Sequence, residues 1–307
     1  MGAHLGLAGA IDGIAARCLW PAGPGAVATA AVSGGPDSLA LLVLARRAGL
    51  DVLAVHVDHC LRDGSGEEAA VVADVARRFG ARFESRVVPV SPGSNVEARA
   101  RAARYSVLPA GVMTGHTADD RAETVMLNLL RGAALDGLAP MRESGRVSRP
   151  LLRLRRDETE TVCAAAGLRP LRDPSNDDLG LRRNAVRHRL LPLMAEISGR
   201  DPVPILCRQA ELLGDDAGFL DAAAGAVDPT DARALAGAAV PLARRAVRRW
   251  LRDGDGERHP PSAADVERVL RVAAGVVLAC EVTGGRRVRR RGGRLGIEAA
   301  WGGPVPE

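Results

Sequence analysis

The feature that most restricts the fold is an alternation of short apolar segments with helical segments over the first 132 residues. The apolar segments are rich in Val, Ala and Leu, which is typical of buried strands. Strands that alternate with helices of about 10–15 residues form parallel βαβ units, in an open sheet with helices on both faces. We therefore predict an α/β fold with strands at 26–32, 51–59, 81–90 and 111–116 and helices at 39–50, 67–81, 95–111 and 118–132.

The pattern changes after about residue 140. An arginine-rich stretch is followed by helical segments, and then by the tail 275–299, in which Gly-Gly pairs separate strand-like segments. That arrangement is typical of a hairpin. The sequence thus predicts a second, smaller and mainly helical domain, with a boundary near 195–205.

Lysine is absent, so all 42 basic residues are arginine. A general bias towards arginine is the simplest cause, but the chemical consequence does not depend on it. A phosphate-binding loop of the GxxxxGK[ST] type, a lysine Schiff base and an enzyme-bound lysyl-AMP are all excluded. If this chain uses ATP, it must hold the phosphates without a lysine.

The net charge of +5 is unevenly distributed, because residues 240–307 carry 14 Arg against 8 acidic residues. This bias favours an anionic partner, of which nucleic acid is the most obvious. A solvated arginine-rich surface is the alternative interpretation.

Neither a metal centre nor a membrane segment is indicated. The uncharged segment 18–36 is interrupted by Pro and Gly, so it does not predict a membrane span, and no basic region precedes an apolar run at the N-terminus. We therefore expect a cytoplasmic protein. Zinc, an iron–sulfur cluster and a disulfide framework are disfavoured, because no CxxC spacing occurs among Cys18, Cys60, Cys163, Cys207 and Cys280.

The strongest candidate for a ligand site is the hexapeptide that follows the first strand. Its two glycines let the backbone approach an oxyanion, and the helix that follows adds positive potential at its N-terminus. A carboxylate repels phosphate, so Asp37 makes sense if a Mg²⁺ ion lies between the two. The sequence therefore predicts a lysine-free phosphate loop made of Ser33, Gly34, Gly35, Pro36, Asp37 and Ser38.

Two further groups of polar residues follow predicted strands. His56 and Asp58 alternate at the end of the second strand and could border a nucleotide, or could simply close the strand with hydrogen bonds. His116, Asp120 and Glu123 have the spacing of one helical stripe, which could bind a metal, act as a base or hold an ammonium group. Helix capping with salt bridges is the alternative for this stripe.

Three arginines near these groups are candidates for phosphate contacts. Arg101 and Arg104 belong to the helix before the stripe, and Arg131 follows the stripe helix. Guanidinium groups bind phosphate oxygens in pairs. A surface salt bridge is the alternative for each of them.

Five sequence blocks together resemble the tRNA(Ile)-lysidine synthetase family within the PP-loop ATP pyrophosphatases. The phosphate loop alone is shared by several enzyme classes, whereas the ordered combination is specific. Three positions depart from the family: Cys60 replaces a usual Gly, Thr117 a frequent His and Arg121 a frequent Gln. The blocks lie between about residues 27 and 192 and read SGGPDS, VHVDHCLR, NVEARARAARY, GHTADDRAETVMLNLLRG and DPSNDDLGLRRNAVRHRLLP.

The resemblance implies a PP-loop ATP-binding catalytic domain over residues 1–198 and a basic, tRNA-contacting domain over residues 199–307. The implied reaction activates carbon 2 of the wobble cytidine of a tRNA(Ile) with a CAU anticodon. Its oxygen attacks the α-phosphate of ATP and releases pyrophosphate. Free lysine then displaces AMP to form lysidine. ATP, Mg²⁺, lysine and this tRNA are the implied ligands, and a homodimer is left open.

The resemblance also implies roles for individual residues. Asp37, His116, Asp120, Glu123 and Arg101 would be catalytic, and Asp37 would also approach Mg²⁺. Asp120 and Glu123 would bind lysine, and replacement of Asp37 or Glu123 with Ala is expected to abolish transfer without unfolding the protein. ATP would be bound by loop 33–38 together with His56 and Asp58, and the tRNA by Arg104, Arg131, Arg183, Arg187, Arg244, Arg245 and Arg248.

Three other functions compete with this interpretation. A PP-loop thiolase acting on carbon 2 of cytidine generally needs paired cysteines, and none is paired here. An amide-forming synthetase for a small acid is disfavoured by the basic tail and the missing glutaminase. A nucleotide-binding regulator without catalysis would leave the acidic stripe and the DPSN block without a purpose.

Overall fold

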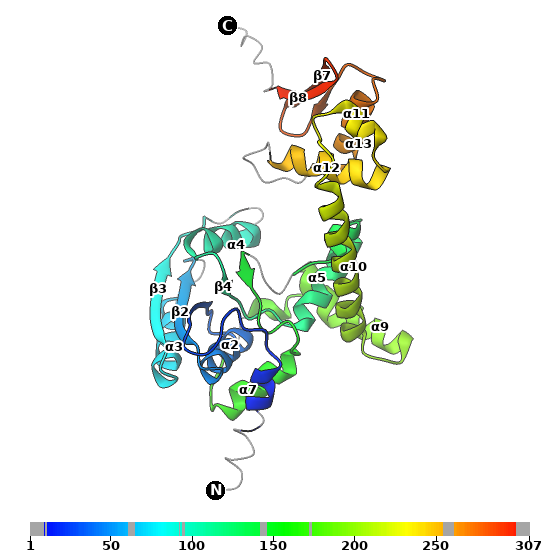
Figure 1. Cartoon of the computed structure of the whole chain (residues 1–307). Coiled ribbons are helices and arrows are strands. Elements are labelled where there is room, and N and C mark those ends of the chain that lie inside the picture. Colours follow the sequence, from blue (N-terminus) through cyan, green and yellow to red (C-terminus); the bar gives the residue numbers. More distant parts are fainter. Residues whose placement is uncertain are drawn as a thin grey trace. The chain divides into compact units, whose positions relative to one another are not determined.

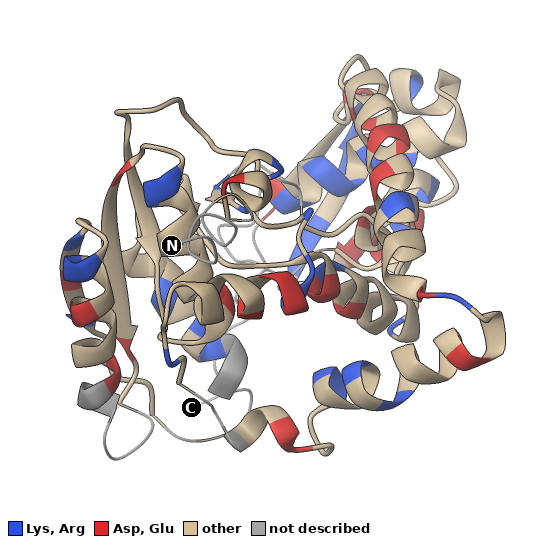
Figure 2. Cartoon of the chain, turned by 90° about the horizontal axis from the view of Figure 1, so that it is seen from below, with Lys and Arg blue, Asp and Glu red and all other residues tan. Residues whose placement is uncertain are grey.

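The structure, a computed structural model, describes residues 9, 11–60, 65–91, 93, 96–141, 146–171, 174–253 and 261–298. The chain forms two compact units, residues 1–214 and 215–307, and the division falls within the long helix α10 (Pro202–Ala224). The expected domains, 1–198 and 199–307, stay a prediction. Acidic and basic residues are interspersed along the helices of both units (Figure 2).

The first unit is built on a five-stranded sheet with the order β3-β2-β1-β4-β5, in which every pair of neighbours is parallel. The four expected strands are confirmed, but each is shorter than predicted, and the one expected at 111–116 keeps only two residues. The fifth strand is only two residues long and lies in the arginine-rich stretch, where no strand was predicted. The strands are β1 (Val27–Ala31), β2 (Asp51–Asp58), β3 (Arg82–Val87), β4 (Val112–Met113) and β5 (Val147–Ser148).

Helices cover both faces of this sheet (Figure 1), as predicted. On one face, α2 and α3 contact the strands and α7 packs on α2; on the other, residues of α4 join strand residues in a smaller cluster. The helices are α2 (Pro36–Arg47), α3 (Ser65–Arg78), α4 (Val96–Val107), α5 (Ala118–Leu130), α6 (Leu135–Leu138), α7 (Arg156–Ala165), α8 (Arg182–Ala185) and α9 (Leu191–Ser198), with a 3-10 turn (Pro174–Asp177) and a π-helical turn (Val186–Leu190).

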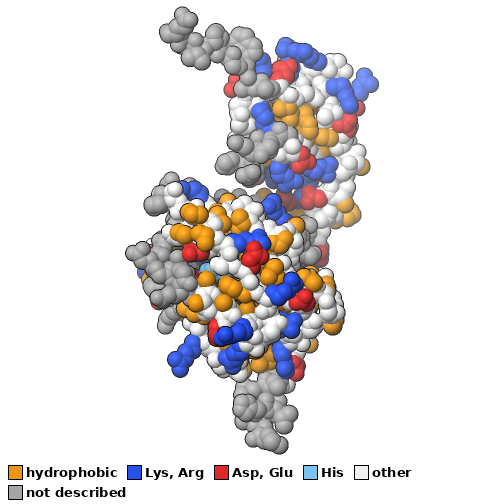
Figure 3. Space-filling view, turned by 90° about the vertical axis from the view of Figure 1, so that its left-hand side faces the viewer, with side chains coloured by type: hydrophobic (Ala, Val, Ile, Leu, Met, Phe, Trp, Pro, Cys, Tyr) orange, Lys and Arg blue, Asp and Glu red, His pale blue; other side chains and the backbone are white. Residues whose placement is uncertain are grey.

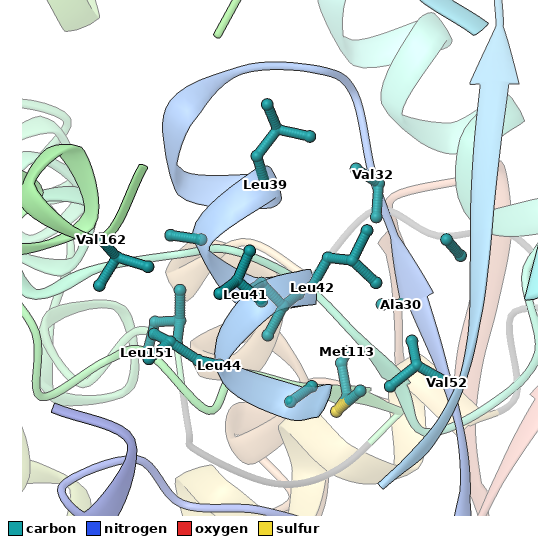
Figure 4. Packing of buried hydrophobic residues seen from close by; sticks show 14 of the residues in the cluster. Ala30, Val32, Leu39, Leu41, Leu42, Leu44, Val52, Met113, Leu151 and Val162 are labelled. Carbon is teal, nitrogen blue, oxygen red and sulfur yellow. The ribbon is translucent and has the colours of Figure 1, made fainter. Parts of the chain in front are cut away.

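The main core is aliphatic and centred on α2. Leu39, Leu41, Leu42 and Leu44 point in different directions around this helix and are all fully buried, because α2 lies between the sheet and α7 (Figure 4). A helix that is apolar all round is stable only in such a buried position. The first turn of α2 is thereby held in a fixed place beyond the carboxyl end of β1, the middle strand of the sheet.

The strand order has a switch point between β1 and β4. From β1 the chain adds β2 and β3 on one side, and then crosses over to add β4 and β5 on the other. In open parallel sheets, ligands bind in the crevice that opens beyond the carboxyl ends of the strands at such a point. The segments that leave β1 and β4 there are the glycine-rich loop 33–38 and residues 114–116.

The second unit contains helices and a three-stranded antiparallel sheet of order β6-β7-β8. Its core is formed by one face of the sheet together with α11, α12 and α13. The expected hairpin is confirmed, and it occurs twice: Gly284 and Gly285 lie between β6 and β7, and Gly292 and Gly293 lie between β7 and β8, all with positive φ. The elements are α11 (Ala232–Gly237), α12 (Val240–Asp253), α13 (Ala263–Ala273), β6 (Ala279–Val282), β7 (Arg286–Arg291) and β8 (Arg294–Glu298).

Two arginines of β7 form hydrogen bonds to helices of the second unit. Arg286 and Arg290 lie on the side of the core and donate hydrogen bonds to the carbonyl oxygens of Leu251 and Ala273, near the ends of α12 and α13. Cations at helix C-termini are stabilising. Arginine side chains are visible on the surface of each unit in Figure 3. No helix in the described part of the chain is long and apolar enough to span a membrane.

Candidate active site

A pocket of about 780 Å³ opens at the switch point of the first unit. Its floor is the loop after β1, and its walls include Thr114, Gly115 and His116 after β4. A volume of this size suits a nucleotide-sized ligand. Five of the six predicted loop residues line it, all except Gly34, whose backbone shapes the turn.

The loop is held in a conformation that exposes the start of α2. Gly34 has a φ of +83°, and a Cβ at this position would lie 2.6 Å from Leu171 Cδ1. The backbone N–H of Ser33 donates to Ser38 Oγ at 3.1 Å, and Ser38 Oγ donates to the Gly35 carbonyl at 3.0 Å. Gly35 occupies the N-cap position and has no side chain to cap the helix, so the first turn is open to an anion.

Gly115 brings the end of β4 against this loop. A Cβ on Gly115 would lie 2.7 Å from the carbonyl carbon and oxygen of Asp37 and 2.9 Å from the backbone nitrogen of Ser38. Backbone atoms cannot move aside as a flexible side chain can, so only glycine fits. The sequence blocks contain Gly115, but pattern alone did not assign it this packing role.

Three carboxylates and three arginines form one charge cluster at the pocket. Glu123, which is fully buried, accepts hydrogen bonds from Arg156, Arg183 and Arg187 at 2.6–3.2 Å. Asp120 Oδ1 accepts from Arg156 at 3.1 Å and from Arg183 at 2.9 Å. The third carboxylate, that of Asp37, lies 3.6 Å from Arg156 Nε. The six formal charges cancel.

Burial and pairing move the pKa values of these groups in opposite directions. Burial, assisted by the charge of Asp120, raises the pKa of Asp37 to about 6. Burial would also raise the pKa of Asp120, but Arg183 and Arg156 outweigh it and hold that pKa below its ordinary value. Burial lowers the pKa of His116 to about 4, so its imidazole is neutral near pH 7. The pocket therefore holds a neutral imidazole beside a paired carboxylate.

The predicted stripe of His116, Asp120 and Glu123 contributes both to the N-terminal cap of α5 and to the pocket. Helix α5 begins at Ala118, so His116 precedes it rather than lying on its surface, which corrects the helical reading of that residue. Asp120 Oδ2 accepts from the backbone N–H and the hydroxyl of Thr117 at 2.8 and 3.1 Å and closes a capping box. Its other oxygen faces the arginines, while His116 Nδ1 lies 2.8 Å from Thr114 Oγ1.

Each of the three residues that depart from the family pattern has defined contacts or backbone geometry in the structure. Cys60 has a φ of +53°, in the left-handed region that favours glycine. Its N–H donates to Asp58 Oδ1 at 2.8 Å, which keeps the turn in place. Thr117 is the N-cap of α5, and the buried Arg121 pairs with Glu211 at 2.6 Å.

Of the other residues of the first unit that were predicted to bind ATP or tRNA, only some lie at the pocket. Arg104 and Arg187 line it. Arg101 instead lies over the ring of Tyr105, 5.1 Å from the centroid. His56 is buried, with Nδ1 3.0 Å from the Val32 carbonyl oxygen. Arg131, Arg183, His56 and Asp58 are not among the lining residues.

The predicted arginines of the second unit belong to α12. Arg244 pairs with Glu267 at 2.6 Å, and Arg245 pairs with Asp221. The Nε atom of Arg248 is buried. None of these contacts tests a role in tRNA binding, which stays a prediction for all three.

Sequence reasoning missed two residues of α7 that contact the acidic groups. Arg156 reaches all three carboxylates of the cluster, and Thr159 donates to Asp37 Oδ1. Thr159 is fully buried, and a polar residue at a buried helical position is the one signal that could have found it. Arg156 is one of many arginines in its stretch and had no distinguishing pattern.

Residues 21–194 match the model of a PP-loop domain family. Three curated proteins similar to this chain carry the name tRNA(Ile)-lysidine synthase. Those from Corynebacterium glutamicum and Nocardia farcinica are 36% and 39% identical and cover 87% and 85% of this chain and 88% and 86% of their own length. The one from Salinispora tropica is 40% identical and covers 89% of this chain and 90% of its own.

A solved structure shares the fold. It is a U34-tRNA thiolase, NcsA, from Methanococcus maripaludis with its [4Fe-4S] cluster, with a TM-score of 0.54 and 15% identity over 67% of this chain and 78% of that one. At this identity the likeness supports the fold alone. The described residues of our chain contain no cluster of three or more His, Cys, Asp or Glu side chains arranged to hold a metal.

Proposed function

The chain belongs to the tRNA(Ile)-lysidine synthase family of PP-loop proteins, and on this premise we propose the reaction that its pocket carries out. It is an ATP-using ligase that converts the wobble cytidine of tRNA(Ile) to lysidine. Similarity to the curated relatives over most of the chain carries this conclusion. The lysine-free phosphate loop at the switch point is consistent with it.

In the first step the loop 33–38 holds the phosphates of ATP through backbone amides and the hydroxyls of Ser33 and Ser38. The oxygen on carbon 2 of the cytidine attacks the α-phosphate, and the bond to pyrophosphate breaks. Asp37 lines the pocket, and one carboxylate with phosphate oxygens is a usual environment for Mg²⁺. The ion, when bound, neutralises charge on the phosphates.

In the second step the ε-amine of lysine attacks carbon 2 and expels AMP. Asp120 and Glu123 form the acidic side of the lysine site, where they attract the ammonium, and one of them accepts its proton. Asp120 lines the pocket, whereas Glu123 lies behind it. His116, which lines the pocket, orients the adenylated base or its phosphate. Arg101, His56 and Asp58 do not line the pocket, so their proposed roles, Arg101 beside His116 and the other two at the border of the nucleotide, require them to approach the bound substrates.

The tRNA with a CAU anticodon is held by its backbone, and the wobble cytidine leaves its stack to enter the pocket. Arg104 and Arg187 line the pocket and are nearest to the reacting base. Arg131, Arg183 and the α12 residues Arg244, Arg245 and Arg248 contribute positive charge, with residues 199–307 as the tRNA-contacting domain. The protein acts in the cytoplasm, and a homodimer is left open.

Transfer of radiolabelled lysine to an unmodified tRNA(Ile)(CAU) transcript tests this function. With ATP and Mg²⁺ we expect label on this transcript and none on a tRNA(Met) control with the same anticodon. Pyrophosphate release should depend on the tRNA. A folded protein that splits ATP but transfers no lysine would contradict the proposal and favour another PP-loop reaction.

A further inference from the structure

The acidic side of the proposed lysine site is already occupied by arginines. Each oxygen of Glu123 accepts two guanidinium hydrogen bonds, and both oxygens of Asp120 are bonded, one to Thr117 and the other to Arg156 and Arg183. A lysine ammonium would meet positive charge here. In this arrangement the carboxylates cannot attract the amine until a guanidinium group leaves.

Two of the three arginines are placed so that they could leave. Arg156 and Arg187 line the pocket beside the phosphate loop, whereas Arg183 does not. ATP brings phosphate oxygens into that pocket, and arginine binds phosphate in the same bidentate manner as carboxylate. The incoming phosphates therefore compete with Asp120 and Glu123 for the same guanidinium groups.

Arg156 is the better candidate of the two to change partner, because it connects the phosphate loop with the acidic side of the proposed lysine site. Its guanidinium group contacts Asp37 in the phosphate loop and the carboxylates of Asp120 and Glu123 in α5. Its backbone N–H donates to Asp119 Oδ2 at 2.8 Å, which fixes the start of α7. The side chain can then change partner without moving the helix.

We propose that ATP binding transfers Arg156 from Asp120 and Glu123 to the ATP phosphates, and that this exchange opens the acidic site to the lysine ammonium. Arg156 is thus a positioning residue that couples the two small substrates. The inference rests on the proposed function. Because coupling between two ligands is reciprocal, lysine must strengthen ATP binding by the same factor.

The test measures lysine binding by calorimetry with and without an ATP analogue that has a methylene bridge between its α- and β-phosphates. For the wild-type protein we expect the analogue with Mg²⁺ to strengthen lysine binding about tenfold, within the usual range of coupling. The Arg156→Gln variant should bind lysine with one affinity whether the analogue is present or absent. Arg156→Lys, which keeps the charge, should recover part of the coupling.

The exposed Arg153 belongs to the same segment, lies outside the pocket lining and provides the matched control. Arg153→Gln should retain the full wild-type coupling. Equal lysine affinity with and without the analogue in the wild-type protein, or no lysine binding in either case, overturns the inference. So does full coupling in Arg156→Gln. Lysidine formation by the same wild-type sample separates this failure from a failure of the proposed function, which would abolish transfer itself.

Discussion

Two ion-pair sites, one in each unit, place arginine in opposite surroundings. In the first unit Arg156, Arg183 and Arg187 surround Glu123, whose side chain is 0% exposed. In the second unit Arg244 and Glu267 form a pair in which each side chain is 51% exposed. Water screens the exposed pair more strongly than the cluster around the buried Glu123. Burial, rather than residue type, thus decides whether an ion pair matters for stability.

Glu123→Gln is expected to give the largest effect in either unit. It keeps the shape of the side chain but leaves three guanidinium groups around a neutral amide. Removing one partner of a buried ionic cluster reduces stability by about 3–5 kcal/mol. Urea unfolding of the full chain measures this. The matched change Glu267→Gln should alter the free energy of unfolding by less than about 1 kcal/mol.

Similar losses of stability in Glu123→Gln and Glu267→Gln would refute the distinction between the buried cluster and the exposed pair. The same experiment decides a point on which sequence and structure differ. The family resemblance implies that Glu123 belongs to the lysine site, where its replacement should leave the protein folded. Its burial among arginines predicts instead that the protein loses stability together with activity.

Much of the first unit follows from local pattern, because periodicity and glycine turns report on neighbouring residues. The four strands, the phosphate loop and the helix from Ala118 were all predictable in this way. Contacts between distant segments were not. Arg156 meets Asp37 and Glu123 only because α7 packs on α2 and the sheet brings α5 beside them. No local signal marks such a residue.

The second unit was predicted less completely for a related reason. The Gly-Gly pairs of the tail predicted a hairpin, and all four of these glycines have positive φ in the structure. The arginines of β7 look alike in sequence. Only the pairing register places Arg286 and Arg290 towards the core, where helix carbonyls accept their hydrogen bonds.

Gly115→Ala tests the close packing of the first unit without changing any charge. The added methyl group would lie 2.7 Å from the Asp37 backbone. Overpacking against backbone that cannot move should reduce stability by about 3 kcal/mol, the upper end of the usual range, and weaken ATP binding. Thermal unfolding with and without ATP measures both effects. Gly23→Ala is the control, since nothing lies within 4 Å of a Cβ there, and an equal loss in both variants would contradict the packing role.

His116 should make the first unit sensitive to acid. Its pKa is lowered to about 4 by burial, whereas the unfolded chain has the ordinary value of 6.5. Between these values the unfolded state binds a proton that the folded state does not, so stability falls as the pH drops below 6.5. At pH 5 the loss from this residue amounts to about 2 kcal/mol.

Comparison of the wild-type protein with His116→Gln isolates this contribution. Unfolding at pH 7.5 and at pH 5 should show a larger loss in the wild-type protein, by about 2 kcal/mol. Asp37, whose pKa is about 6, titrates in both proteins. Asp120, Arg101, Arg149 and Arg183, the other groups that act on His116, remain unchanged. The same acid sensitivity in both proteins would show that His116 is not held neutral.

Replacement of Arg244 is expected to have the smallest effect on stability. Its main effect is expected on tRNA binding instead. Arg244→Gln breaks only an exposed pair, so the free energy of unfolding should change by less than about 0.5 kcal/mol. If Arg244 contacts a tRNA phosphate, the plot of the logarithm of the tRNA-binding constant against the logarithm of the salt concentration should become less steep by about one. Anisotropy titrations from low to high salt measure this slope. Glu267→Gln frees Arg244 from its partner and should strengthen tRNA binding at low salt. An unchanged slope in Arg244→Gln would show that this arginine does not contact a tRNA phosphate. Its exposed ion pair with Glu267 would then be its only contact of note within the described part of the chain.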